Sequence, residues 1–445
     1  MKSPRFKALG GGDEIGASCY HYKFSWPKSR YGYLSVIVDC GMRPHGRSSG
    51  PKLEYLRHVD VIIITHAHAD HCVFTPVLVR MFPEAVIYMT PETYDLFLIQ
   101  MEDSVAINMR NAKETGEQPL FTKIDVERML MQIKLVPFWH RIDLPAGVSV
   151  LPVPAGHILG AASLYMKQDC GRQEHSIFHS GDISFENQCL IPGAPKRFYP
   201  NSPINTGVLE ATNLHSHPRS TTRNRKEEEN RLIEEICEVL GNGGRAVIPV
   251  LKIHRQSEMW EMLVSHGIPQ SKIFIDGNPS KIFEIYQKHT SISRLPESQI
   301  IHHWRHDRWK MWRKNEPCVI LASGGMMQER SAALENARMV IENENDALFV
   351  VNYMDPCSPG GELLDHIARG KKEIEIGLER FDIRCRVERF PGLSSHAGND
   401  DLLDLAERAR DRVIWIHGED KRVKKHLASA PGHHVQGKNG KGITL

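Results

Sequence analysis

Short apolar runs separated by polar or glycine-rich segments make up the first part of the chain. Their lengths are typical of strands, and the expected strands lie at 34–39, 59–65, 85–89, 148–153 and 176–179. A helical stretch follows Pro76. The first strand ends in Asp39, and the second runs into a histidine-rich loop. The pattern predicts a β-rich, layered domain with polar side chains at its strand ends.

The pattern changes after residue 206 to alternating helices and buried strands. Residues 230–240 carry apolar side chains at helical spacing and stop at a glycine-rich turn. Buried strands are expected afterwards at 246–250, 273–276, 318–323 and 347–353. This alternation is typical of βαβ units around a parallel sheet, so we predict a second, Rossmann-like domain.

The end of the chain resembles its beginning more than its middle. A strand, a histidine-containing loop, a helix at 400–408 and a last strand at 412–417 follow one another. We therefore predict that the second domain is an insertion. The predicted boundaries give a first domain at 1–206, the inserted domain at 207–383 and a return to the first domain at 384–445.

Composition and charge exclude several other classes of protein. The 445 residues are 41% apolar and 25% charged, as in a folded enzyme, and the apolar runs are too short for a membrane span. The formal charge of +2 is small, so contact with a polyanion has to come from local basic patches. Nine dispersed cysteines and an N-terminus without an apolar signal core predict a reduced, cytoplasmic protein.

The densest group of reactive side chains lies at 65–71, with the sequence Thr-His-Ala-His-Ala-Asp-His, directly after a predicted strand. Residues two apart in an extended segment point the same way, so His66 and His68 can share one metal ion. The following turn directs Asp70 and His71 toward a second ion. The alternative is a chance cluster, because the chain holds 24 histidines, but this density is costly without a metal.

Two metal ions need more ligands, and three candidates stand at later strand ends. They are His157, Asp182 and His417, each beside a glycine that permits close backbone approach. A carboxylate such as Asp182 can bridge two ions, and mixed imidazole and carboxylate ligation suits zinc. Each candidate taken singly could be an ordinary core or surface residue. Their order after the histidine-rich loop favours them as ligands.

The order of these motifs resembles that of the metallo-β-lactamase superfamily. A strand-end aspartate (Asp39), the HxHxDH sequence at 66–71, a lone histidine (His157) and a lone aspartate (Asp182) follow one another as in that family. The resemblance implies an α/β fold of the αββα sandwich type and a site that holds two Zn²⁺ ions. It also implies that Asp39 supports the metal-binding loop from behind the ligands.

Three further residues resemble the β-CASP group of this superfamily, which contains RNA-processing and DNA-repair nucleases. They are Glu210 in Leu-Glu-Ala-Thr, His396 in Ser-His-Ala, and His417 in the last strand. The resemblance implies that the inserted Rossmann-like domain is a β-CASP domain. RNA-processing branches carry histidine at the position of His417, so RNA is the expected partner. Departures from the group's pattern at 213–214 and 251–254 leave details of the substrate open.

The resemblance also implies a mechanism for cutting RNA, which we expect to be single-stranded. A hydroxide bridging the two zinc ions would attack phosphorus, with Asp70 among the residues of the catalytic centre. His396, oriented by Glu210, would act as the general acid. Because the attacking oxygen comes from water, DNA remains an alternative substrate. Endonuclease and 5′ exonuclease action both remain open, as does a homodimer.

Two other functions compete with this prediction. A non-catalytic scaffold is disfavoured because every expected ligand position is intact, and a small-molecule metallohydrolase has no obvious use for the insertion or for the Glu210 and His396 pair.

Three segments could contact nucleic acid. Residues 304–314 interleave aromatic and basic side chains, as in a surface that binds single strands, but they also fit an amphipathic helix. Residues 323–325 form either a phosphate-binding turn or an ordinary one. The histidines and arginines at 215–225 either line a cleft or form a charged surface.

Overall fold

The computed structural model divides the chain into two compact units. The first unit contains Met1–Asn187, Ile191–Arg219 and Ser395–Leu445, and the inserted unit contains Gln188–Leu190 and Ser220–Ser394. The structure describes residues 3–43, 50–169, 171, 174–196, 204–214, 224–302, 306–377, 379–430 and 432–445. Within these ranges no helix is both long and apolar enough to cross a membrane. The cysteines in the same ranges all carry free thiols.

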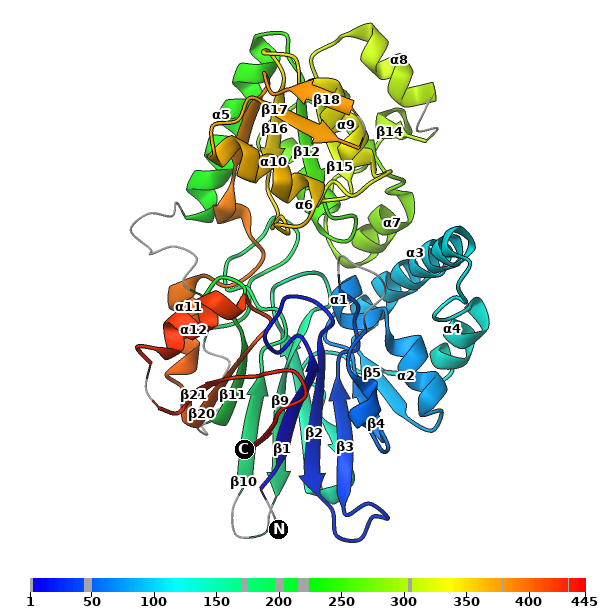
Figure 1. The fold of residues 1–445 in the computed structure, drawn as a ribbon, viewed down its shortest axis with the longest axis vertical. Coiled ribbons are helices and arrows are strands. Elements are labelled where there is room, and N and C mark those ends of the chain that lie inside the picture. The colour runs from blue at the N-terminus through cyan, green and yellow to red at the C-terminus, as the bar shows by residue number, and fades with distance from the viewer. Residues whose placement is uncertain are drawn as a thin grey trace. The chain divides into compact units, whose positions relative to one another are not determined.

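Two seven-stranded sheets form the first unit (Figure 1). The strand order of one sheet is β22 (Gly442–Thr444), β1 (Arg5–Gly10), β2 (Cys19–Ser25), β3 (Tyr33–Val38), β4 (Val61–Ile63), β5 (Val86–Met89) and β6 (Ile133–Leu135). The order of the other is β21 (His434–Gln436), β20 (Ala409–Ile416), β11 (Ile204–Glu210), β10 (Glu174–His179), β9 (Ala162–Asp169), β8 (Val148–Pro154) and β7 (Ile142–Leu144).

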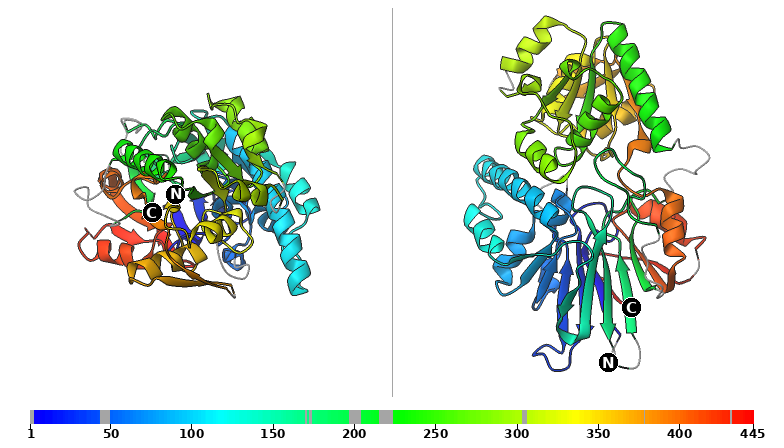
Figure 2. Two further views of the ribbon diagram at one scale, coloured as in Figure 1. Left: turned by 90° about the horizontal axis from the view of Figure 1, so that it is seen from above. Right: turned by 180° about the vertical axis from the view of Figure 1, so that it is seen from behind.

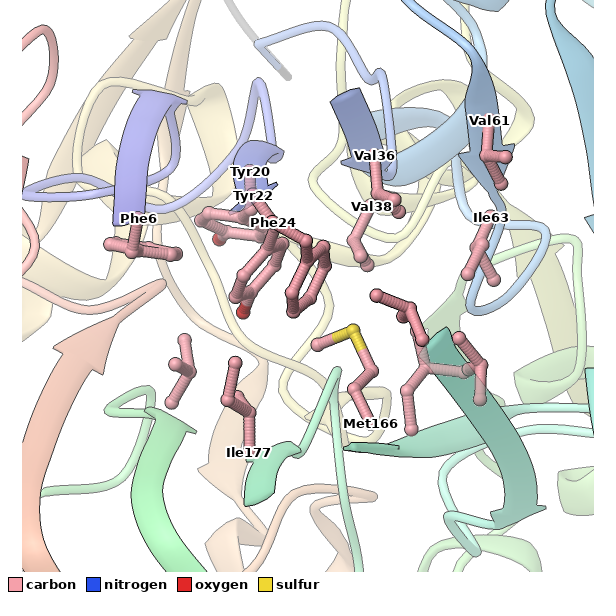
Figure 3. Packing of buried hydrophobic residues seen from close by; sticks show 14 of the residues in the cluster. Phe6, Tyr20, Tyr22, Phe24, Val36, Val38, Val61, Ile63, Met166 and Ile177 are labelled. Carbon is pink, nitrogen blue, oxygen red and sulfur yellow. The ribbon is translucent and has the colours of Figure 1, made fainter. Parts of the chain in front are cut away.

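The core of the first unit lies between these sheets. Alternate side chains of each strand point inward, and Figure 3 shows aromatic residues such as Phe6, Tyr20 and Phe24 of the first sheet packing toward Met166 and Ile177 of the second. All five are almost completely buried. Burying one such large side chain contributes about 1.5–3 kcal/mol. This packing fixes the strands that end at the candidate site.

Helices cover the outer faces of this pair of sheets. Figure 1 shows α2 (Thr75–Met81), α3 (Pro91–Thr115) and α4 (Lys123–Leu130) beside β4 and β5. On the other sheet, α11 (Asn399–Ala406) packs against β11 and β20, and α12 (Asp420–Leu427) packs against β21. The resulting order of layers is the αββα sandwich that the sequence predicted.

Several elements of the first unit were not predicted. The region after β5 forms the 25-residue helix α3, which begins at an N-cap bond from Thr93 N to Thr90 Oγ1 and ends at Gly116 in the left-handed region. The expected last strand is followed by α12, β21 and β22, and β22 returns to pair with β1. The end of the chain therefore completes the first sheet.

The inserted unit holds a six-stranded parallel sheet, drawn from behind in Figure 2. Its order is β14 (Ile300–Ile301), β13 (Ile273–Asp276), β15 (Val319–Ser323), β12 (Ala246–Val250), β16 (Ala347–Val350) and β19 (Arg386–Arg389). The helices between and around the strands are α5 (Arg225–Gly241), α6 (Arg255–Ser265), α7 (Ser280–His289), α8 (His306–Lys314), α9 (Ala332–Val340) and α10 (Pro359–Ala368). A two-stranded ribbon, β17 (Glu373–Ile376) and β18 (Glu379–Asp382), completes the unit. This arrangement is Rossmann-like.

The unit boundaries differ from the predicted domain boundaries at both ends of the insertion. The predicted start at residue 207 falls inside β11, which pairs with β10 and β20 of the first unit. The predicted return at residue 384 precedes β19, which pairs with β16 of the inserted unit. Hydrogen bonds to strands distant in the sequence place β11 in the first unit and β19 in the inserted unit. The local pattern of apolar residues contains no information about such pairing.

Candidate metal centre

Several strands of the first unit end at one edge and carry the candidate residues there. Strands β8, β10, β11 and β20 all run in the same direction, as their pairing shows. His157 follows β8, Asp182 follows β10, Glu210 ends β11 and His417 follows β20. At Gly156 (φ 70°), a Cβ would lie 2.4 Å from Ala194 N, so only glycine fits this turn.

The HxHxDH sequence forms the turn between β4 and the short helix α1 (Ala69–Cys72). His68 is the N-cap residue of α1, so Asp70 lies in the first helical turn. His66 and His71 are almost completely buried. The chain changes from extended backbone to helix at His68, so the side chains of this one motif point in more than one direction.

His66, His68 and His157 form a first group of candidate metal ligands, the first ligand group, and their ring nitrogens lie within 4.8 Å of one another. His157 Nε2 lies 3.1 Å from His68 Nδ1. Two ligands at about 2.0–2.1 Å from one tetrahedral zinc ion lie about 3.3 Å apart, which agrees with this spacing. His157 is oriented by a 2.8 Å hydrogen bond between its Nδ1 and the carbonyl of Ser395.

Asp70, His71 and His417 form a second group of candidate metal ligands, the second ligand group. His417 Nε2 lies 3.2 Å from Asp70 Oδ2. Asp182 lies between the two groups, with Oδ2 3.4 Å from His71 Nε2 and 3.7 Å from both His66 Nε2 and His157 Nε2. The sequence prediction that Asp182 could bridge two ions agrees with this position.

The donor atoms of these residues fit a metal ion. Among the described residues, buried His66 Nε2 and Asp182 Oδ1 have no hydrogen-bond partner, and such atoms are costly to bury without a ligand. Burial lowers the pKa of His66 well below its usual value and lowers that of His68 to about 4. Both imidazoles are therefore neutral, the form that binds metal. Burial alone would raise the pKa of Asp182, but His417 and His71 outweigh it and keep the carboxylate ionised.

Asp39 supports the histidine-rich loop through three hydrogen bonds. Its Oδ1 accepts from Thr65 N and its Oδ2 from Thr65 Oγ1, both at 2.8 Å, and Oδ2 lies 2.8 Å from His71 Nδ1. The carboxylate is fully buried. These contacts use both oxygens, so Asp39 supports His71 through Nδ1 and leaves Nε2 of that ring facing Asp70 and Asp182.

Partly buried His396 and fully buried Glu210 form a pair beside the first ligand group. His396 Nδ1 lies 2.8 Å from Glu210 Oε2, and the ring centres of His396 and His157 are 4.6 Å apart. Glu210 Oε1 accepts a hydrogen bond from Ile183 N at 2.6 Å. Burial alone would lower the pKa of His396, but the charge and hydrogen bond of Glu210, with Asp182 and Asp70, raise it to about 9. The imidazole is therefore a proton donor at neutral pH.

The segments that could contact nucleic acid contain more structural residues than the sequence indicated. In α8, Trp312 is buried and donates to Asn336 Oδ1 at 3.3 Å, and Arg308 is paired with Asp276. This agrees with the amphipathic helix, although 303–305, including Trp304, lie outside the described residues. The turn at 323–325 precedes α9 by several residues, so it does not lie at a helix N-terminus.

The charged segment at 215–225 is described only at its end. His215, His217, Arg219 and Arg223 lie outside the described residues. Arg225 begins α5 and is buried in ion pairs with Glu229 and Glu258 of the inserted unit. Its guanidinium therefore has a structural role.

Sequence reasoning missed residues whose roles depend on tertiary contacts. Thr65 holds both Asp39 and His66, with its Oγ1 3.0 Å from His66 Nδ1. Thr212 contacts His417. Thr65 stands next to the HxHxDH motif and Thr212 stands two residues after Glu210, and this proximity was the only signal available in the sequence.

Comparison with known proteins agrees with this geometry. Residues 30–177 match the family model of the metallo-beta-lactamase superfamily domain, and 380–435 match that of a Zn-dependent metallo-hydrolase RNA specificity domain. Both matches support the predicted assignment to the metallo-β-lactamase superfamily and its β-CASP group. The chain is a metal-dependent hydrolase, and its cluster of histidines and aspartates is suited to a divalent metal ion.

Its curated relatives include archaeal proteins named transcription termination factor FttA. The protein of Cenarchaeum symbiosum (strain A) is 27% identical over 96% of this chain and 69% of its own length. Those of Methanocaldococcus jannaschii and Methanothermobacter thermautotrophicus are 26% and 27% identical, each over 94% of this chain and over 67% and 68% of their own lengths. The predicted superfamily, fold class and class of enzyme are confirmed.

Proposed function

We propose that this chain is a two-zinc phosphodiesterase that hydrolyses single-stranded RNA and uses His396 as its general acid. The observation that carries the proposal is the pair of ligand groups on either side of Asp182, with the His396 and Glu210 pair next to them. His66, His68 and His157 would hold one ion, Asp70, His71 and His417 the other, and Asp182 both. The RNA specificity domain matched at 380–435 and the name of the relatives support RNA as the substrate.

The bound ions would activate a water molecule and neutralise charge on the phosphate oxygens. The side chains of the protein would supply the proton for the leaving group. A water-derived oxygen attacks phosphorus and the bond to the 3′ oxygen breaks, which leaves a 5′-phosphate on the downstream fragment. The departing 3′ oxygen takes a proton from Nε2 of His396, because Nδ1 is held by Glu210. Glu210 keeps that histidine charged until the transfer.

Cleavage of end-labelled single-stranded RNA and matched DNA by the zinc-loaded protein tests the proposal. The wild type should cut RNA and leave 5′-phosphate ends, while His68→Ala and His396→Ala should lose activity and only His68→Ala should lose zinc. His140→Ala is the matched control, because this histidine is exposed in the same unit, and it should behave as wild type.

Each part of the proposal has its own contrary outcome. Equal cleavage of DNA would contradict RNA preference. Full activity of His396→Ala would contradict its role as the acid. Two bound zinc ions without cleavage of either polymer would contradict the nuclease and favour a small-molecule metallohydrolase. The size ladder of the products separates endonuclease from 5′ exonuclease action.

A further inference from the structure

Thr212 contacts His417 at the edge of the second sheet of the first unit. Glu210 at the end of β11 pairs with Ile416 at the end of β20, so the two chains leave the sheet side by side. Thr212 is only 6% exposed. Its Oγ1 lies 3.2 Å from His417 Nδ1 and also donates to the carbonyl oxygen of His417 at 3.2 Å.

These two contacts determine which nitrogen of His417 carries the proton. A hydroxyl has one proton, and the bond to the His417 carbonyl uses it, so Oγ1 has to accept a hydrogen bond from Nδ1. When a metal ion replaces the proton that Nε2 would otherwise donate to Asp70 Oδ2, the one remaining proton of the neutral imidazole lies on Nδ1, and the lone pair of Nε2 is available to the ion. Nε2 is the nitrogen that lies 3.2 Å from Asp70 Oδ2. We propose that Thr212 is a positioning residue that holds His417 in the tautomer able to bind a metal ion.

Neighbouring residues fix the backbone of His417 but not the orientation of its imidazole ring. His417 has a left-handed backbone (φ 49°), and its N–H donates to Gly11 O at 2.6 Å. A side chain at Gly418 would place its Cβ 2.6 Å from Ala211 Cβ. The peptide is therefore fixed from both sides, and rotation of the imidazole is restrained by Thr212.

Arg422 holds Thr212 in place. Asp182 also lies near His417 Nδ1, but it is a proposed metal ligand. Arg422 Nη1 donates to Thr212 O at 3.2 Å. Asp182 Oδ1 lies 3.4 Å from His417 Nδ1, farther than the hydroxyl. Because Asp182 is a proposed ligand of both ions, its oxygens are engaged when metal is bound, and the hydroxyl of Thr212 remains the partner of Nδ1. Partners of this kind raise the affinity of a ligand for its metal.

The inference rests on the proposed function, and a comparison of three variants tests it. Thr212→Val removes the hydroxyl at constant shape, Thr212→Ser restores it, and Thr206→Val is the matched control. Thr206 lies on β11, the strand that precedes Thr212. It is fully buried, and its Oγ1 lies 3.4 Å from Nε2 of His175, which is not a proposed ligand. Competition with a chelator measures zinc affinity, and thermal melting of each metal-free variant checks its fold.

Thr212→Val should weaken the binding of one of the two zinc ions by about 10–100-fold, whereas Thr212→Ser and Thr206→Val should bind like wild type. Unchanged affinity in Thr212→Val would overturn the inference, and so would a loss that serine does not restore, because packing would then explain it. A wild type that binds fewer than two zinc ions would instead contradict the proposed function, and the inference with it.

Discussion

Replacing Glu210 with glutamine should shift the alkaline limit of RNA cleavage and leave activity at mildly acidic pH almost intact. The glutamine keeps the size of the side chain and can still accept from Ile183 N, but it removes the negative charge 2.8 Å from His396 Nδ1. Burial lowers the pKa of His396, and Glu210 is the largest influence that raises it to about 9. Without that charge, the pKa should fall toward the ordinary histidine value of about 6.5.

The size of the effect follows from the fraction of His396 that is protonated. A general acid works only in its protonated form, so activity is lost as pH rises through its pKa. At about pH 8 a group with a pKa of about 9 is roughly 90% protonated, and one with a pKa of about 6.5 is roughly 3% protonated, a difference of about 30-fold. At about pH 6 the same two groups differ by less than about twofold.

The assay is a pH profile of kcat/KM for zinc-loaded wild type and Glu210→Gln on one RNA. Glu258→Gln is the control, since Glu258 is an equally buried carboxylate of the inserted unit that accepts from Cys189 N and Leu190 N. It should lower the melting temperature without moving the alkaline limit. A defect of Glu210→Gln that is the same at every pH would refute the reasoning, because Glu210 would then act on structure alone.

Three further predictions concern the support of the site and the stability of the first unit. Asp39→Asn removes the charge beside His71 and should weaken zinc binding by about 10–100-fold in a chelator competition, whereas unchanged affinity would show that the loop needs no such support. Burial, with Lys23 and His58, lowers the pKa of His21 to about 3, so the folded protein binds one proton fewer than the unfolded chain between pH 3 and 6.5. As the pH decreases through that range, His21 should therefore lower the free energy of unfolding by up to about 1.4 kcal/mol per pH unit. His21→Gln should make the pH dependence of urea unfolding of metal-free protein shallower, and an unchanged slope would contradict the assignment. Leu164→Ala, at a fully buried position between the sheets, should cost about 2–5 kcal/mol in the same assay, and a loss below about 1 kcal/mol would place Leu164 outside the core.

The parts of the site that depend on local sequence could be predicted. The motif at 66–71 joins strand to helix within a few residues, so its geometry is local, and His157, Asp182 and His417 each follow a recognisable strand. The contact between Thr212 and His417 could not be predicted, because it joins residues 205 positions apart in the sequence and depends on the parallel pairing of β11 with β20. Long-range strand pairing is also the reason why the predicted domain boundaries differ from the unit boundaries.

Prediction also failed where the apolar pattern was weak. The C-terminal part of α3 buries few side chains, so its sequence lacks the apolar stripe of an amphipathic helix. Strands β21 and β22 have three residues each, too short for a period to be recognised. Both strands are defined by their neighbours in the sheets and by the backbone hydrogen bonds they share with them.

Titration of zinc into metal-free protein, with RNA cleavage measured at each step, tests the central claim most directly. If both ligand groups and Asp182 form one catalytic centre, cleavage should stay near its background during the first equivalent, rise through the second and then remain constant. Full activity after one equivalent, or activity that persists without any metal, would contradict a two-metal centre at these residues.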